Sequence, residues 1–294
     1  MSLPPPITNQ AYCNVSALES GTIRLHFSQF TTSASPDDVL FVPSLSFLLQ
    51  HSSKESKFIF DLGIRKDWEN LPPLTIEQIK QNFHVSIPQD VVESLTKGGT
   101  LPSDIHTICL SHLHFDHIGD MDLFPESTFL VGADSKHLKS APSPENPLAL
   151  ALNHLPPERT RYLDTSQCPP LGPFPHALDF YEDGSLYIVD AAGHLPGHIN
   201  VLARTSADGA WVYLASDSAH HWDLITGKGS IVVTEGTGFA RCAHADKEAA
   251  ERHNLRIRQL GEIPRVRVLL AHDGPWYEGN KDGPAFWPGK IPSM

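Results

Sequence analysis

The segment from residue 111 to residue 120, SHLHFDHIGD, constrains this chain more than any other feature. It carries four metal-capable side chains within six positions: His112, His114, Asp116 and His117. In an extended or tightly looped segment, His112 and His114 project to the same side, and Asp116 and His117 reach past them to a second position. Zinc binds imidazole nitrogens and carboxylate oxygens at about 2.0–2.2 Å, and paired metal ions lie about 3.5–4 Å apart. One short loop of this kind can therefore supply ligands to two metal ions.

Four short apolar segments in the second half of the chain each lead into a further metal-capable residue. Continuous apolar runs of this length are typical of strands buried on both faces, and sites in open α/β sheets gather at strand ends. We therefore expect strands at residues 105–110, 186–189, 211–215 and 266–271 to deliver His112, His194, Asp217 and His272, respectively.

The remaining pattern predicts a mixed α/β chain. Alternation of apolar and polar residues predicts a strand over residues 22–30. Apolar runs predict a strand beside a loop over 39–50 and a buried strand over 58–63. A capping box that starts at Thr75 predicts a helix. Two further helices are expected over 89–97, before Gly98, and over 246–260, before Gly261.

Residues 135–182 are rich in proline and poor in periodicity, which predicts a long structured loop inserted into a single domain over residues 1–294. The segment is either a lid over the site or a surface connection. Its aromatic side chains Phe174, Phe180 and Tyr181, together with Trp222, are expected either to cover an apolar pocket or to pack on the core.

The composition narrows the classes of partner. The formal net charge is -12 and no run of Lys and Arg occurs, so a basic footprint for nucleic acid or for an anionic membrane is not expected. The four cysteines are widely spaced, and the N-terminus has no signal-peptide pattern, which favours a cytoplasmic protein with reduced thiols. We expect a small-molecule substrate; the sequence indicates no particular oligomeric state.

The metal-capable segments also resemble a known family. SHLHFDHIGD contains the HxHxDH signature of the metallo-β-lactamase superfamily, and GHLPGH at 193–198 is similar to that family's GHTPGH turn. ASD at 215–217, LAHD at 270–273 and Asp61 in FIFDLG resemble three further elements in the same order. The resemblance covers roughly residues 39–273. It implies an α/β fold of the αββα four-layer sandwich type.

The resemblance also implies a ligand set. The first zinc ion would be held by His112, His114 and His194, the second by Asp116, His117 and His272, and Asp217 would bridge them. This gives two Zn²⁺ per chain, with another divalent metal as the alternative. A hydroxide formed between the ions would attack a carbonyl, and Asp116 would carry the proton to the leaving group. No ligand role is implied for the remaining histidines of this region, His198, His220, His221, His244 and His253.

Within the superfamily, the order of motifs looks most like the N-acyl homoserine lactonase branch, which implies hydrolysis of a small cyclic ester. A lactam or cyclic carbamate hydrolase is the nearest alternative. A glyoxalase II-like thioesterase, a mononuclear-iron persulfide dioxygenase and a binding scaffold without activity are alternatives of other classes. His114 stands where diiron members carry Glu, which favours zinc hydrolysis over redox chemistry.

His220 departs from the branch pattern. Lactonases of this branch usually carry a Tyr three residues after the bridging Asp, where this chain has His220. We expect His220 to be a second catalytic residue beside Asp116, facing the substrate and donating a hydrogen bond to its carbonyl.

Overall fold

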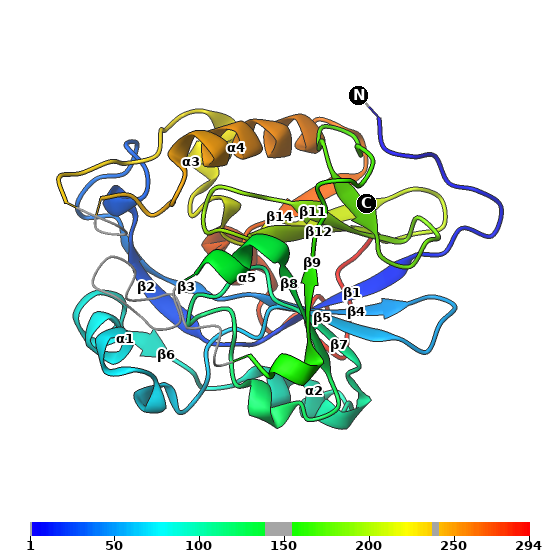
Figure 1. The fold of residues 1–294 in the computed structure, drawn as a ribbon, viewed down its shortest axis with the longest axis horizontal. Helices are drawn as coiled ribbons and strands as arrows, with labels where there is room; N and C mark the ends of the chain where they lie inside the picture. The colour runs from blue at the N-terminus through cyan, green and yellow to red at the C-terminus, as the bar shows by residue number, and fades with distance from the viewer. Residues whose placement is uncertain (1, 139–154, 237–240) are drawn as a thin grey trace.

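The computed structural model describes residues 2–138, 155–236 and 241–294. Two large β-sheets lie face to face, and a third, smaller sheet lies beside them (Figure 1). Helices cover the outer faces of the two large sheets. The sequence motifs follow the strands of these two sheets, so the fold decides where the metal-capable side chains meet.

The first sheet has six strands in the order β1-β4-β5-β7-β8-β9. Its N-terminal strands pair antiparallel, whereas β5, β7, β8 and β9 run parallel. The strands are Cys13–Leu18, Ser46–His51, Lys57–Phe60, Thr107–Cys109, Thr128–Gly132 and Thr160–Leu163.

The second sheet has five strands in the order β10-β11-β12-β13-β14. Its first four strands pair antiparallel and β14 runs parallel to β13. The strands are Ala177–Asp179, Leu186–Asp190, Ile199–Arg204, Trp211–Leu214 and Val266–Leu269.

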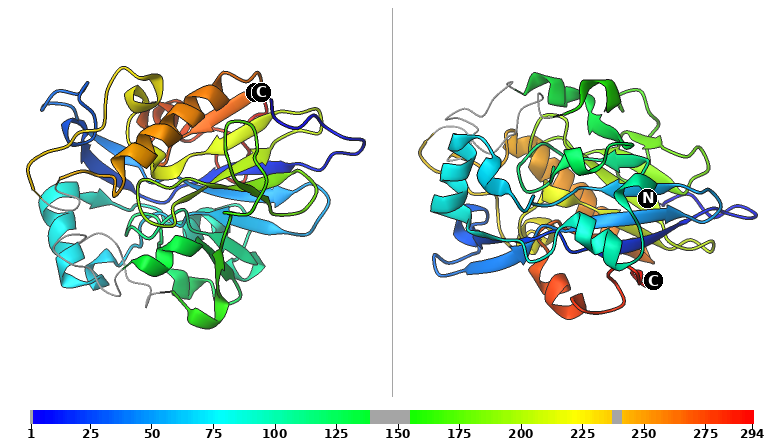
Figure 2. Two further views of the ribbon diagram at one scale, coloured as in Figure 1. Left: turned by 45° about the horizontal axis from the view of Figure 1, so that its top comes forward. Right: turned by 90° about the horizontal axis from the view of Figure 1, so that it is seen from below.

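The third sheet has the order β3-β2-β6, with bounds Val39–Pro43, Thr22–His26 and Val85–Ser86. The α-helices are Pro73–Gln78 (α1), Val91–Lys97 (α2), Trp222–Thr226 (α3), Lys247–Gly261 (α4) and Gly274–Asn280 (α5). Figures 1 and 2 show α4 across the outer face of the second sheet and α2 on the opposite side of the molecule.

Three apolar clusters separate these layers. One cluster fills the space between the two large sheets, where Phe47 and Phe58 of the first sheet share it with Ile188 and Val201 of the second. A second cluster packs α2 on the outside of the first sheet, and a third packs α4 on the outside of the second. Burial of both faces of both sheets confirms the predicted αββα four-layer sandwich.

Several local predictions need correction. Thr75 is not a helix cap: α1 begins two residues earlier at Pro73, because a proline fits the first turn of a helix. The strand predicted over 22–30 ends at His26 and gives way to a short helical turn. The segment 135–182 is more than a loop, since it supplies the edge strands β9 and β10; residues 139–154 of it lie outside the described residues.

Candidate metal centre

The loop after β7 carries four of the predicted side chains, all buried. His112, His114, Asp116 and His117 follow directly from the end of this strand. The loop turns back through Gly119, which has a positive φ of 49°, and its amide donates to the carbonyl of Gly63. Glycine is required at such a turn because a Cβ there would meet the Leu62 carbonyl at 2.7 Å.

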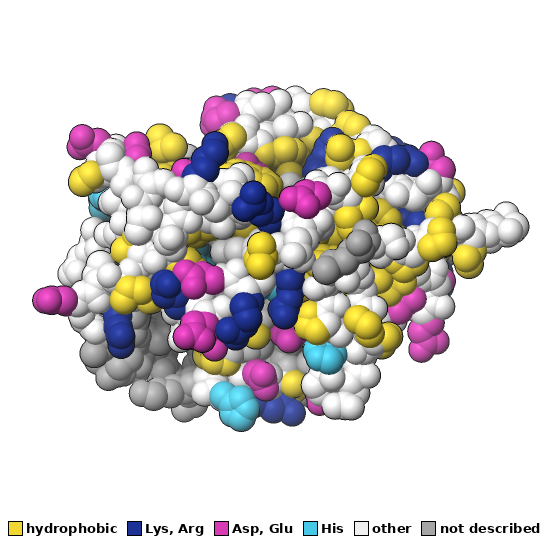
Figure 3. Space-filling model, turned by 90° about the horizontal axis from the view of Figure 1, so that it is seen from above, with side chains coloured by type: hydrophobic (Ala, Val, Ile, Leu, Met, Phe, Trp, Pro, Cys, Tyr) yellow, Lys and Arg dark blue, Asp and Glu magenta, His cyan; other side chains and the backbone are white. Residues whose placement is uncertain are grey.

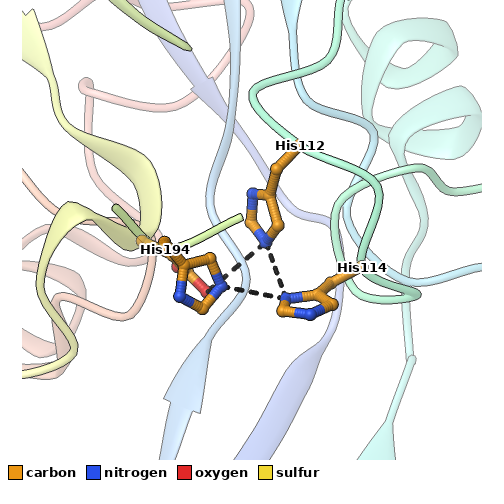
Figure 4. A group of neighbouring side chains, drawn as sticks. His112, His114 and His194 are labelled. Atoms are coloured by element: carbon orange, nitrogen blue, oxygen red, sulfur yellow. Dashed lines mark hydrogen bonds and ion pairs between the residues drawn. The ribbon is translucent and has the colours of Figure 1, made fainter. Parts of the chain in front are cut away.

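Three imidazoles form the first group. The Nε2 atoms of His112 and His194 each lie 2.9 Å from Nδ1 of His114, and Figure 4 shows the three rings directed at one another. His112 and His114 come from the loop after β7, and His194 comes from the turn between β11 and β12. With Asp217, they offer four ligand atoms that all lie within 4.8 Å of one another.

Asp116, His117 and His272 form a second group. One ligand atom of each of these residues also lies within 4.8 Å of the others. Asp217 lies between the two groups. Its Oδ2 is 3.6 Å from Nε2 of His194 and 3.4 Å from Nε2 of His117, and its Oδ1 is 3.3 Å from Nε2 of His272. One carboxylate therefore faces both groups, because β13 and β14 run parallel and end side by side.

The other ring nitrogens of three of these histidines are held by fixed partners. Nδ1 of His117 lies 2.9 Å from Asp61, and Nδ1 of His272 lies 2.8 Å from the carbonyl of Pro43. Nδ1 of His112 lies 2.9 Å from the hydroxyl of Ser111. Such outer contacts set the ring orientation and leave the Nε2 lone pair for a metal ion.

The protonation of the cluster suits metal binding. Burial, together with neighbouring imidazoles, holds the pKa of His112 and of His194 well below the usual range, and burial lowers the pKa of His114 to about 3. These rings are neutral donors at neutral pH. Burial opposes the charge of Asp217, but His272 and His117 outweigh it and hold its pKa well below the usual range. In the second group, burial raises the pKa of Asp116. Burial opposes the charge of His117 and of His272, but the charge of Asp217 outweighs it and raises the pKa of both rings. Imidazole nitrogens and carboxylate oxygens are the donor set of zinc and similar divalent ions.

Asp61 supports this cluster from beneath. It adopts a left-handed φ of 60°, and its carboxylate accepts hydrogen bonds from the amide of Ser111 at 2.7 Å and from the Ser111 hydroxyl at 2.8 Å. The same carboxylate faces His117. A strained residue that is held by several partners is typical of functional sites.

Replacing Asp61 by Asn is expected to loosen the loop after β7. The amide group would place a donor against the donors of Ser111 and remove the charge beside His117. We expect a loss of about 3–5 kcal/mol in the free energy of unfolding, as for a broken buried pair, and about 10–100-fold weaker metal binding. Denaturant unfolding and chelator competition measure the two effects.

Glu93→Gln, which breaks an exposed pair with Lys66, is the control. It should change neither the stability nor the metal affinity by much. Wild-type metal affinity in Asp61→Asn would contradict the supporting role of Asp61.

A cavity opens directly onto the cluster. Its floor contains His114, Asp116, His194, Asp217 and His272, and its wall is apolar. The wall residues are Ile23, Leu25, Phe30, Phe83 and Phe115. The cavity therefore combines a polar metal-capable floor with a surface suited to the body of an apolar compound.

His220 also lines this cavity. Its ring stacks on Phe30, with centroids 4.4 Å apart, and its Nε2 lies 3.2 Å from Oδ2 of Asp217. The structure thus brings every residue of the predicted site, His220 included, to one end of the sandwich.

The predicted covering aromatics are not at the cavity. Phe174 stacks on Tyr213 inside the third cluster, Phe180 packs against Phe58, and Tyr181 packs against His51. Trp222 donates to Asp273 instead. Of the two predicted roles, packing on the core is the one observed for Phe174, Phe180 and Tyr181, which flank the edge strand β10.

The sequence reading missed two features. The apolar wall comes from β2, from the turn after it and from the segment before β6, whose residues look like ordinary core positions. His244 was given no role, yet it lies beside His194 and His220, which with it form a further group of close ring nitrogens. His244 precedes α4, whose first turn packs against the GHLPGH turn, and no local signal in the sequence marks this tertiary contact.

A family model of the metallo-beta-lactamase superfamily matches residues 39–209. This match spans more than half of the chain, and its motifs are those that build the cluster. The chain belongs to the metallo-beta-lactamase superfamily. Its buried His and Asp residues form groups whose ligand atoms lie close enough together to hold divalent metal.

Several known proteins are similar to the chain. Metallo-hydrolase mfmC of Annulohypoxylon moriforme is 36% identical, over 92% of this chain and 82% of its own length. Gamma-lactamase FDB1 of Fusarium pseudograminearum is 36% identical, over 63% of this chain and 47% of its own. Cytochrome P450 monooxygenase mpaDE' of Penicillium brevicompactum is 33% identical over 99% of this chain, which spans only 37% of that protein.

A solved structure of N-acyl homoserine lactone hydrolase, with its product N-hexanoyl-L-homoserine at the catalytic metal centre, has the same fold. The TM-score is 0.70 at 18% identity, over 95% of this chain and 98% of that one.

Among the described residues, no helix has the length and apolar character needed to cross a membrane. On the face nearest α3 and α4, Lys and Arg side chains are interspersed with Asp and Glu (Figure 3).

Proposed function

We propose that this chain is a two-zinc hydrolase that opens a small cyclic ester. The first ion is held by one group of ligands, the second by another, and Asp217 bridges them. The groups are His112, His114 and His194 for the first ion and Asp116, His117 and His272 for the second. The position of Asp217 carries this proposal, because its two carboxylate oxygens lie within 3.3–3.6 Å of ring nitrogens from both groups.

Zinc ions bound here would polarise a carbonyl and lower the pKa of a water molecule to about 7. The chain's own residues do the rest. Asp116 lines the cavity, where its carboxylate is placed to take a proton from the attacking water and deliver it to the leaving oxygen. Nε2–H of His220 faces Asp217. It is a hydrogen-bond donor at the end of the cavity where Asp116 also lies.

The apolar wall supports a small neutral substrate. Ile23, Leu25 and the three Phe side chains suit the body of a compact ring compound. A carbonyl of that ring would reach the floor. The shared fold with a lactone hydrolase and the acidic character of the chain, at net charge -12, agree with a cyclic ester better than with a polyanion.

A lactam or cyclic carbamate hydrolase is the second candidate. The same attack on a carbonyl opens these rings, with nitrogen instead of oxygen as the leaving atom. The similarity to gamma-lactamase FDB1 favours this candidate.

A substrate panel tests the proposal. The zinc-loaded protein is assayed against lactones of several ring sizes, lactams, cyclic carbamates, glutathione thioesters and phosphodiesters. We expect cyclic carbonyl compounds to be cleaved fastest, with turnover of lactones followed by proton release and that of lactams and carbamates by chromatography. Chelated protein, restored by added zinc, is the control. Faster cleavage of thioesters or phosphodiesters than of every cyclic compound would overturn the substrate class while leaving the metal site in place.

A further inference from the structure

Three histidines form a group beside the first metal-binding group. His194, His220 and His244 are at most 4% exposed, and one ring nitrogen of each lies within 4.8 Å of one of each other. Their ring centroids are 5.1–5.5 Å apart. They come from three separate segments of the chain, so the group is a product of the tertiary fold.

The segment that carries His244 is fixed against the turn that carries His194. The amide of Ala245 donates to the carbonyl of His194, and the amide of Asp246 donates to that of Gly193, both at 2.9 Å. Helix α4 packs directly on this turn, because a Cβ at Gly193 would meet the amide nitrogen of Ala250 at 2.5 Å. The place of the His244 ring relative to His194 is therefore set by backbone contacts.

Each member of the group has a buried Nδ1 atom that makes no hydrogen bond within the described part of the chain. Buried polar atoms are rarely left in this state, because the loss of their water contacts is costly. Four of the metal-binding histidines direct Nε2 at the cluster. In His112, His117 and His272 the Nδ1 atom has an outer partner, whereas Nδ1 of His194 has none from a described residue.

The protonation of each ring follows from its other nitrogen. A His194 ring that binds metal through Nε2 carries its proton on Nδ1, which is then a donor. The Nε2 of His220 faces the carboxylate of Asp217 at 3.2 Å and carries the proton, so its Nδ1 is an acceptor. Nδ1 of His244 is the third buried nitrogen of the group without a described partner.

We propose that one buried water molecule joins these three Nδ1 atoms and that His244 is a positioning residue for the metal-binding His194 and the substrate-facing His220. The water accepts a hydrogen bond from Nδ1–H of His194 and donates its two hydrogens to Nδ1 of His220 and of His244. All three orphaned atoms are satisfied at once. Two hydrogen bonds of about 2.9 Å at a tetrahedral angle span about 4.7 Å, and one ring nitrogen of each histidine lies within 4.8 Å of one of each other.

A metal ion fits this position less well than water. The Nδ1 of His194 keeps its proton while Nε2 binds the first ion, so only two imidazole lone pairs remain for a cation. Water instead makes three hydrogen bonds, the usual number for a buried water molecule. The water also holds His220 in the tautomer whose Nε2–H points to the cavity floor.

The experiment compares His244→Phe, which keeps a ring but removes both nitrogens, with His244→Asn, whose amide oxygen stands near the position of Nδ1. Metal affinity is measured by chelator competition on the zinc-loaded protein, and kcat and KM on the best substrate of the panel. We expect His244→Phe to bind zinc about 10–100-fold less tightly than the wild-type protein. We also expect its kcat to fall with little change in KM. His244→Asn should recover much of both losses. His51→Phe, which removes a buried histidine paired with Asp183, is the control for stability alone and should retain wild-type metal affinity.

A crystal structure of the zinc-loaded protein gives a readout that needs no variant. A water molecule within hydrogen-bond distance of the three Nδ1 atoms is expected. An anomalous signal at that point would show a metal instead, and wild-type metal affinity in a folded His244→Phe would remove the positioning role; either result overturns the inference. The inference depends on His194 being a metal ligand. Absence of bound metal in the wild-type protein would count against the proposed function itself, so the two failures are distinguishable.

Discussion

Asp217→Ala is expected to lose nearly all bound metal and to lower turnover by more than about 10³-fold. The loss of a single donor to a reacting oxyanion costs about 10²–10³ in turnover, and the loss of the metal centre removes more than one such contribution. Metal analysis after gel filtration and initial rates on the best substrate measure the two quantities.

The physical reason lies in the position of Asp217 between two groups of imidazoles. Its carboxylate lies 3.2–3.8 Å from ring nitrogens of five histidines, and no other carboxylate among the described residues faces both groups so closely. Removing it leaves buried nitrogen donors without the negative charge that balances a divalent ion. Without the shared anion the two ions would also repel each other, so the imidazoles alone should not retain them.

Asp223→Ala is the matched control. Asp223 lies six residues further along, in the first turn of α3, with its side chain about one quarter exposed and outside the cavity lining. This variant should retain both metal and turnover. Full activity in a metal-free preparation of either protein would remove the basis of the proposed function.

The metal-capable residues could be predicted because each motif is compact and its chemistry depends on residue type. The HxHxDH motif places four metal-capable side chains within six residues of one loop. The local sequence therefore nearly determines their relative positions. His194, Asp217 and His272 follow buried strands, and the apolar runs before them show where those strands end. The four-layer fold follows from the same strands, since their burial on both faces requires a second sheet and outer helices.

The substrate cavity could not be predicted in the same way. Ile23 and Leu25 alternate with polar residues as in any half-buried strand, and nothing local distinguishes a wall residue from a core residue. Phe174 and Phe180 show the opposite case. Their loop-like surroundings suggested that they could cover the cavity, but both pack in the core. Which apolar side chain meets the substrate is decided by tertiary packing, and that information is spread over segments far apart in the sequence.

His220→Ala is expected to lower turnover by about 10²–10³-fold while leaving the metal content unchanged. Such a loss is typical when one donor to a reacting carbonyl oxygen is removed. His220 lines the cavity, and its Nε2 lies 3.2 Å from the carboxylate of Asp217, so its N–H lies near the point where a carbonyl on the proposed metal centre would develop charge. The two bound ions do not depend on it in the proposed ligand set. Metal analysis and kcat on the best substrate measure the two effects separately.

The adjacent His221 offers a close control. It caps the N-terminus of α3 by accepting from the amide of Asp223, and it packs against Phe27 outside the cavity lining. His221→Ala should therefore cost about 1 kcal/mol of stability and leave turnover near the wild-type value. His220→Tyr adds a second comparison, because a phenol restores a donor at the position where the related lactonases carry Tyr. If the hydrogen-bond donor matters, His220→Tyr should recover part of the turnover that His220→Ala loses. If His220 only fills space against Phe30, His220→Ala would keep both its metal and its turnover, and the catalytic role would be wrong.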